Sequence, residues 1–479
     1  MSISSAGIGS GLDVNSIVRQ LVSIERQPIR LLQGQASRLE TQISAFGRLQ
    51  GAMSTLRDAA VKLGTASNWQ QSTATSTNTA AVGITTTGAA QAGNFSVVVS
   101  QLAVGQTLSS ARFAAPATTL GSGTLRIELG NFNAVPPVPK TGATAVDIVI
   151  DPTKSSLSEI RDQINAAGAG VVASIVNDID GSRLVMRSAQ TGAENGFRVQ
   201  IQADGDGNAA DATGLSALAF DPSTGGVNNM SRAQTAINAR ATIDGIAVEA
   251  SSNTLSGTIE GLTLSLRQMG QAEVVVEPDT GALKKSVDDF VNAFNETVKL
   301  LRAQTSFDPA TKQAGPLQGD PSGKAMLSQL RSLFTGDGGA SSAFNRLADV
   351  GLSLNTDGTV KVDASKLSAA LANGSELQKL FANVDTAAPA RQGIANRMQG
   401  WLKQSLDGEG TLPSRTQSLQ DRVRSNKEAQ DRLEDRVART QERLLRQYTS
   451  LDTRMGQLSG LASYVSQQMT MLNNSNNRR

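Results

Sequence analysis

The chain has 479 residues, which is too long for a single hydrophobic core, so its length favours about three domains. Its 44 basic and 42 acidic residues nearly cancel and aromatic residues make up only 3%, which argues against binding of nucleic acid or an anionic membrane. The sequence lacks Cys and His, and this excludes thiol nucleophiles, Ser-His-Asp relays, imidazole metal ligands and disulfides. No apolar run of about 18 residues predicts a membrane-spanning helix, and the first residues lack the features of a conventional signal peptide.

The N-terminal region predicts an amphipathic helix behind a short stretch of small residues. Asp13 is of a residue type that caps helix N-termini, and Ile17, Leu21 and Ile24 follow at helical spacing. Pro28 predicts a kink, because proline lacks an N–H donor and its ring clashes with the preceding turn. The apolar stripe resumes at Leu32, Leu39, Ile43, Phe46, Met53, Leu56, Ala60 and Leu63. A helix of this length with one apolar seam needs a partner.

The middle of the chain has the texture of a β-rich region. Phe95, Val97 and Val99 alternate with polar residues, as in a half-buried strand. Strand texture recurs at 121–130, 145–150, 171–176, 183–186, 241–250, 261–268 and 272–278. One helix interrupts these strands behind a capping box of Ser156 and Glu159, whereas residues 203–232 have the Asp-, Gly- and Asn-rich composition of a loop. Strands on both sides of this helix predict two β modules, one inserted in the other.

Helical texture returns after Pro278. A second long seam runs through Leu283, Val287, Phe290, Phe294, Val298 and Leu301. Asp320 and Pro321 predict the start of another helix, and Asp357-Gly358 predicts the turn of a short hairpin. Further helices are expected near 363–381 and 390–406.

The last segment predicts a coiled-coil helix over about 413–472. Its inner positions alternate in steps of three and four, with a stutter around Leu444. They are Leu419, Val423, Asn426, Gln430, Leu433, Val437, Thr440, Leu444, Tyr448, Leu451, Met455, Leu458, Ala462, Val465, Met469 and Leu472. The polar Asn426 and Thr440 lead to the hypothesis that they lower stability while fixing register, and the second half is expected to form the stronger seam. Both terminal helices need a partner for their stripes, so the two ends of the chain are expected to come together.

Two motifs resemble ligand sites without meeting their requirements. Gly7, Gly9 and Gly11 lack the preceding strand of a dinucleotide-binding loop. The sequence from Asp204 to Leu215 does not fit a calcium-binding loop. Position six is Ala209 where the loop needs Gly, and position twelve is Leu215 where it needs Glu. We therefore interpret Asp204, Asp206, Asn208 and Asp211 as an exposed turn, and no metal or cofactor site is predicted.

Two further features have competing interpretations. The charges between Arg415 and Arg446 are interpreted as the solvated face of a long helix, with an electrostatic contact between subunits as the alternative. Trp69 and Trp401 are predicted to pack in the core of the helical part, with a partner-binding site as the alternative.

Four segments together resemble the bacterial flagellar filament cap family, also called hook-associated protein 2. The opening GIGSGLDVNSIVRQLVSIERQPIRLL resembles its N-terminal signature. SLSEIRDQINAAGAGVVASIVNDIDGSRLVMRS is similar to the helix-plus-hairpin unit of hook-associated proteins, and GLSLNTDGTVKVD to the family's hairpin before the C-terminal helices. YTSLDTRMGQLSGLASYVSQQMTMLNN is similar to the C-terminal coiled-coil strand. AVPPVPK and residues 204–211 fall where the family varies most, so no surface recognition is carried over there.

The resemblance implies a structural protein at the tip of the flagellum. Subunits would form a ring, expected to be a homopentamer, with terminal helices as legs and β domains as a plate under which exported flagellin folds and is inserted. The implied partners are other copies, flagellin, hook-filament junction proteins and an export chaperone for the C-terminal helix, with host mucin or glycans as further candidates and neither nucleic acid nor membrane. The protein would be extracellular and exported by the flagellar type III apparatus without a cleaved signal peptide.

We therefore predict an α+β multidomain protein with no catalytic residues. Its domains are a terminal coiled-coil domain (1–39 and 440–479), a helical leg domain (40–71 and 279–439), a first β-rich head domain (72–116 and 233–278) and an inserted second one (117–232). The predicted assembly interface comprises Ile17, Leu21, Ile24, Leu32, Leu444, Tyr448, Leu451, Met455, Leu458, Val465, Met469 and Leu472. Alternatives are an adhesin-like module, another axial junction protein and, least favoured, a hydrolase.

Overall fold

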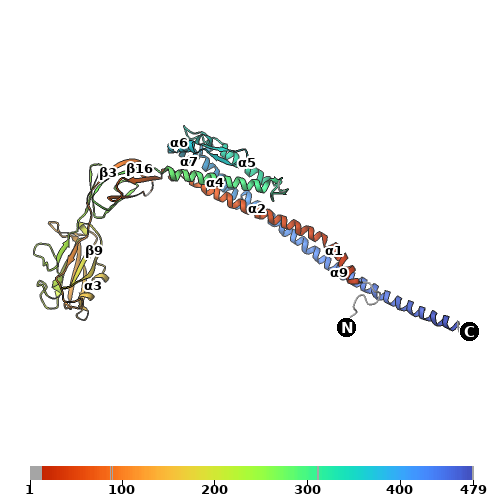
Figure 1. Ribbon diagram of the computed structural model, residues 1–479, viewed down its shortest axis with the longest axis horizontal. Helices are drawn as coiled ribbons and strands as arrows, with labels where there is room; N and C mark the ends of the chain where they lie inside the picture. Colours follow the sequence, from red (N-terminus) through yellow and green to blue (C-terminus); the bar gives the residue numbers. More distant parts are fainter. Residues whose placement is uncertain (1–12, 87, 89, 310–311, 477–479) are drawn as a thin grey trace. The chain divides into compact units, whose positions relative to one another are not determined.

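The computed structural model describes residues 13–86, 88, 90–309 and 312–476. About 47% of the chain is helical and 24% is in strands, with helices at both ends and β-rich domains in the middle, which confirms the α+β prediction. The chain divides into two compact units, a helical one built from residues up to 69 and from 281 onward, and a β-rich one of residues 70–280 (Figure 1). Gly7, Gly9 and Gly11, which the sequence analysis rejected as a dinucleotide-binding loop, lie outside the described residues.

The helical unit begins with α1 (Val14–Glu25) and α2 (Gln27–Gly64). The backbone N–H of Ser16 donates to the Asp13 carboxylate at 3.0 Å, so Asp13 caps α1 as predicted. The predicted kink is a break between the two helices at Arg26. Pro28 occupies the first turn of α2, where its missing N–H costs no helical hydrogen bond.

The rest of this unit comes from the C-terminal part of the chain. Its helices are α4 (Thr280–Thr305), α5 (Pro321–Thr335), α6 (Ala364–Leu371), α7 (Gly374–Ala382), α8 (Ile394–Leu406) and α9 (Thr411–Asn476). Short hairpins are β17 (Phe307–Asp308) with β18 (Gln313–Ala314), and β19 (Leu352–Leu354) with β20 (Val360–Val362). One continuous core joins α2, α4 and the following helices. Trp69 is buried in it, 5.5 Å from the ring of Phe381, which confirms the core prediction for this residue, whereas Trp401 is half-buried and packs against the core.

The β-rich unit contains two cores. The first lies between a five-stranded antiparallel sheet, in the order β1-β16-β3-β12-β13, and a three-stranded sheet, in the order β14-β15-β2. These strands are β1 (Ser72–Ser76), β2 (Val82–Thr86), β3 (Gly93–Gln101), β12 (Ala239–Ile243), β13 (Ile246–Ala250), β14 (Thr254–Ser256), β15 (Leu262–Leu266) and β16 (Gly270–Pro278). Val97 and Val99 of β3 point into this core, as their alternation predicts.

The second core is covered by α3 (Leu157–Ala166) and two four-stranded sheets. One sheet has the order β10-β5-β6 with β7 also on β5, and the other has the order β11-β4-β9-β8. The strands are β4 (Thr107–Ser109), β5 (Gly123–Asn131), β6 (Val138–Pro139), β7 (Val146–Ile150), β8 (Val171–Asp178), β9 (Gly181–Ser188), β10 (Phe197–Asp204) and β11 (Ser231–Gln234). Ser156 and Glu159 form both hydrogen bonds of the predicted capping box.

Two features of this unit differ from the sequence analysis. Residues 203–232 look like a polar loop in sequence, yet Leu215, Leu218 and Phe220 are buried in the second core. Strand β4 and its Leu108 also belong to the second core, so the chain passes between the two cores about ten residues before the predicted boundary at 116/117. Backbone bonds between Val104 and Ile237, at 3.1 and 3.2 Å, hold the two crossing segments together.

Candidate assembly surface on the terminal helices

The two ends of the chain pair with each other through α1 and α9. Val14, Val18 and Val22 of α1 are buried together with Ile29 and with Val437 of α9. The α9 side is completed by the half-buried side chains of Leu433, Leu444, Leu445 and Tyr448. The prediction that the termini come together is therefore confirmed for the described part of α1.

The buried face of α1 is not the one that the apolar spacing predicts. Ile17 and Leu21 are only half-buried and Ile24 is 59% exposed, while Val14, Val18 and Val22 face α9. Both sets have helical spacing, and Ile17 and Leu21 each precede a buried valine by one position, about 100° round the helix, so periodicity alone does not choose between them. Contact with α9 buries the valines, leaves Ile17 and Leu21 half-buried and leaves Ile24 exposed.

A polar layer lies inside the pairing of α2 with α9. Asn426 is buried, its side-chain amide donates to Gln35 at 3.3 Å, and its carbonyl accepts a hydrogen bond from Gln430 at 2.6 Å. Such a buried polar residue at a seam position costs stability but favours one register of the two helices. This geometry agrees with the register hypothesis for Asn426.

The C-terminal segment of α9 exposes its apolar side chains. Figure 1 shows α9 continuing past the start of α1, without another described helix beside it. The exposed large apolar residues there are Leu451, Met455, Leu458, Leu461, Tyr464, Val465, Met469 and Met471. Monomeric soluble proteins rarely expose such a contiguous set, which is typical of an interaction surface. We call residues 451–471 of α9 the open apolar segment.

The structure distributes the predicted interface residues over two environments. Leu444 and Tyr448 are half-buried against the pairing of the chain's own ends, and Leu32 of α2 is also half-buried. Leu451, Met455, Leu458, Val465 and Met469 lie on the open apolar segment, and the side chain of Leu472 lies outside the described ones. Leu461, Tyr464 and Met471 are also exposed on this segment but do not belong to the predicted interface, although their apolar character at helical spacing is a signal that the sequence contains. The half of α9 expected to form the stronger seam is thus the one without a partner among the described residues.

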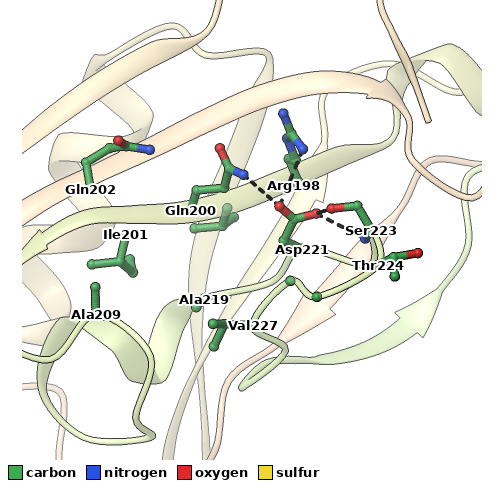
Figure 2. A pocket seen from close by; sticks show the side chains of 13 residues that line it. Arg198, Gln200, Ile201, Gln202, Ala209, Ala219, Asp221, Ser223, Thr224 and Val227 are labelled. Carbon is green, nitrogen blue, oxygen red and sulfur yellow. Dashed lines mark hydrogen bonds and ion pairs between the residues drawn. The ribbon is translucent and has the colours of Figure 1, made fainter. Parts of the chain in front are cut away.

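A pocket beside β10 is lined by residues of β10 and of the segment 219–227 (Figure 2). The Asp221 carboxylate lies in it and accepts hydrogen bonds from Gln200 at 2.6 Å and from the backbone of Ser223 at 3.1 Å. Arg198 lies 3.4 Å from Asp221 and 2.6 Å from Glu128, so one guanidinium pairs with two carboxylates. These polar groups bind each other rather than pointing at open space.

The electrostatics of this pocket indicate a structural role. Burial alone would raise the pKa of Asp221, but hydrogen bonds from Ser223 and Gln200 and the charge of Arg198 outweigh burial, so its pKa lies below the ordinary value. A carboxylate held ionised by such partners is poorly suited to act as a general acid or base near neutral pH. The pocket therefore supports no particular reaction.

The carboxylates of the acidic segment at the end of β10 also accept hydrogen bonds from neighbouring residues. Asp204 accepts hydrogen bonds from the backbone and hydroxyl of Ser216 at 2.7 and 2.5 Å, and Asp206 accepts one from the backbone of Asn208 at 2.9 Å. Among the described residues, no group of three or more His, Cys, Asp or Glu side chains is arranged to hold a metal ion. Within the same residues, no helix combines the length and the apolar character needed to cross a membrane.

Comparison with known proteins agrees with the sequence and the fold. A family model described as flagellar hook-associated protein 2 C-terminus matches residues 236–460, the corresponding N-terminus model matches residues 10–106, and a flagellin hook IN motif matches residues 139–190. The flagellar hook-associated protein 2 of Escherichia coli strain K12 is 31% identical, with all of both chains covered. The chain belongs to the flagellar hook-associated protein 2 family.

One further relative and one solved structure extend this comparison. The B-type protein of Pseudomonas aeruginosa is 30% identical over 95% of each chain. A crystal structure of the D1, D2 and D3 domains of the flagellar cap protein FliD from Escherichia coli matches with a TM-score of 0.63 at 29% identity, covering 78% of this chain and 99% of that one. Hook-associated protein 2 is a structural flagellar family, and membership favours neither the adhesin nor the hydrolase alternative.

Proposed function

We propose that this chain is a subunit of the cap at the distal end of the bacterial flagellar filament, where it promotes folding and insertion of exported flagellin. The family and the structural match to a flagellar cap protein support the capping role. Capping of an extracellular filament requires a subunit that holds its neighbours through surfaces that it does not use for its own fold.

The open apolar segment is the observation that carries this proposal. Leu458 is 62% exposed and Val465 is 51% exposed, although both have the spacing of a helix seam. Burial of apolar surface contributes about 25 cal/mol per Å², so a partner helix along this segment would gain substantial free energy. We assign the predicted interface residues of α9 to contacts between cap subunits or with the filament beneath them.

The finer architecture forms part of the same proposal. The four hydrophobic clusters support a terminal domain, a helical leg domain and two β-rich head domains, with the changeover between the heads near residue 105. We propose a ring of identical subunits, expected to be a pentamer, in contact with flagellin and with the hook-filament junction proteins. An export chaperone that covers the open apolar segment before assembly would keep it from aggregating.

Filament growth in a strain deleted for this gene tests the capping role. We expect the strain to release unpolymerised flagellin, and we expect added full-length protein to restore filaments. Normal filaments in the deleted strain would contradict the proposal. Mass spectrometry of the protein collected from the medium would test export without cleavage.

A further inference from the structure

The outer side of α9 between residues 421 and 446 carries a regular line of acids. Asp421, Glu428, Asp435 and Glu442 are exposed and spaced seven residues apart, about two helical turns. The first three each lie two residues from a buried residue, namely Leu419, Asn426 and Val437. Two residues correspond to about 200° of rotation, so these acids lie on the side of α9 that faces away from α1 and α2. We call these four residues the acid line.

Arginines lie directly beside the acid line. Arg436, Arg439 and Arg443 are exposed and surround a surface hollow of about 470 Å³, together with Arg432, Asp435 and Thr440. We call Arg436, Arg439 and Arg443 the arginine cluster.

The arginine cluster is not paired within its own helix. Three members of the acid line do pair within the helix, Asp421 with Arg424 at 3.6 Å, Glu428 with Arg432 at 3.9 Å and Glu442 with Arg446 at 3.1 Å, whereas Asp435 has no ion pair among the described residues. Asp435 and Arg439 have the same favourable spacing, yet no ion pair or hydrogen bond joins the arginine cluster to another described residue. Three neighbouring guanidinium groups attract carboxylates, which they can bind through two parallel hydrogen bonds.

We propose that the arginine cluster binds the acid line on α9 of a neighbouring copy of this chain. The proposal rests on the proposed function, because subunits of a ring present their α9 helices in the same direction. Arg436 and Arg443 are seven residues apart, the same repeat as the acid line. When two parallel α9 helices are shifted along their axes so that one acid lies beside one arginine of the neighbour, the shared repeat therefore places further acids beside further arginines.

The charged contact and the open apolar segment would then contribute differently to association: the charges to its selectivity and the apolar segment to its affinity. Exposed ion pairs contribute little affinity individually, but complementary charges select the partner, its orientation and its axial offset. Apolar contacts of residues 451–471 would supply most of the affinity. The charged contact should weaken as salt rises, because the Debye length falls from about 10 Å at 0.1 M to about 3 Å at 1 M.

Disulfide cross-linking between full-length chains tests the contact directly. The chain has no native cysteine, so Asp435→Cys and Arg439→Cys variants each carry a single thiol. Mixed in solution at low salt, this pair should form cross-linked heterodimers roughly tenfold faster than a control pair of Asp435→Cys with Lys427→Cys, and raising the salt to about 0.5 M should remove the difference. Equal rates for both pairs at low salt, or a difference insensitive to salt, would overturn the proposal.

Charge exchange provides a second readout in the deleted strain. Arg436→Glu with Arg443→Glu, and Asp435→Lys with Glu442→Lys, should each reduce filament growth, and expressing the two variants together should restore part of it. All four positions are exposed, so circular dichroism of each variant should match the wild type. If wild-type protein restores filaments but the charge variants grow like wild type, this contact is wrong and the capping role stands. If wild-type protein fails to restore filaments, the capping role itself is wrong, whatever the cross-linking shows.

Discussion

At the scale of single residues, Asn426 and Glu376 each organise a junction of the helical unit. Asn426 joins Gln35 of α2 to Gln430 of α9 through two side-chain hydrogen bonds inside the pairing of these helices. Glu376, in the first turn of α7, accepts hydrogen bonds from Ser341, from the backbone of Ser342 at 2.7 Å and from Lys379 at 2.6 Å. Polar side chains at such positions determine which packing of helices and loops forms and contribute less to its stability.

Asn426→Leu should raise the free energy of unfolding by about 1 kcal/mol, because a buried amide is replaced by an apolar group while Gln35 and Gln430 can turn to water. Urea unfolding measures this change, and Asn426→Ala, which leaves a hole in the seam, should lower stability instead. With Thr440→Val added, filament growth should slow as register is loosened. Unchanged growth in that double variant would contradict the register hypothesis.

Glu376 should stabilise its loop until the solution is strongly acidic. Hydrogen bonds from Lys379, then Ser341 and Ser342, lower its pKa from an ordinary 4.5 to about 2. A folded-state pKa below the unfolded one gives stability that is complete above about pH 4.5 and is lost as the pH falls toward 2. The difference in unfolding free energy between wild type and Glu376→Gln should follow this course in urea titrations. A difference that is constant from pH 7 to pH 2 would contradict this account.

At the scale of elements, α9 consists of two halves with different environments. Val437, 3% exposed, packs against α1, whereas Leu458, 62% exposed, lies on the open apolar segment. Both are aliphatic residues at seam positions of the same continuous helix. A charge introduced at Val437 should therefore destabilise the fold, whereas a charge introduced at Leu458 should leave the fold intact and impair assembly.

Leu458→Asp should abolish capping while the isolated chain keeps its thermal stability, because the new carboxylate stays in water until a partner covers it. Val437→Asp is the matched control and should destabilise the pairing of α1 with α9 by about 3 kcal/mol, since it buries an unpaired charge. Thermal unfolding followed by complementation of the deleted strain separates the two effects. Wild-type motility from Leu458→Asp would count against the open apolar segment as an assembly surface.

At the scale of the whole molecule, the second β core is an insertion into the first. Val104 and Ile237 are bonded through their backbones where the chain leaves and re-enters the first core. The termini of an excised insert therefore already lie side by side, which is the arrangement that tolerates deletion best.

Replacing residues 106–235 with a short Gly/Ser linker should leave a soluble chain whose remaining strands fold. Excision of 117–232, at the boundaries expected from sequence, is the control. This control retains β4 but removes β8 and β9 of the same sheet. Leu108, which is fully buried in the intact protein, becomes exposed, so the control should aggregate or unfold at a lower temperature. Size-exclusion chromatography and thermal unfolding compare the two. Equal behaviour would contradict the boundary placed by β4.

Helix starts and caps are predictable from the sequence because their signals are local. The Asp13 cap, the Ser156–Glu159 capping box and the Asp320–Pro321 helix start each depend on neighbouring residues, and the structure confirms them. The seam of α4 from Leu283 to Leu301 is likewise buried as its spacing predicts. By contrast, Leu215 and Phe220 are buried in a segment of loop-like composition, because contacts from distant strands, such as Phe220 with Val199, decide their environment.

The order of helical and β-rich segments, the lack of cysteine and histidine, and the resemblance to the filament cap family are all readable from the amino-acid order. Which of two adjacent stripes of α1 is buried, to which core β4 belongs, and which half of α9 stays open depend on long-range packing. Periodicity depends on the chain's own helical or extended geometry, so it is readable from one segment at a time. Which face of that segment is covered depends on what another segment, far away in sequence, brings against it, and this information is present only in the folded chain.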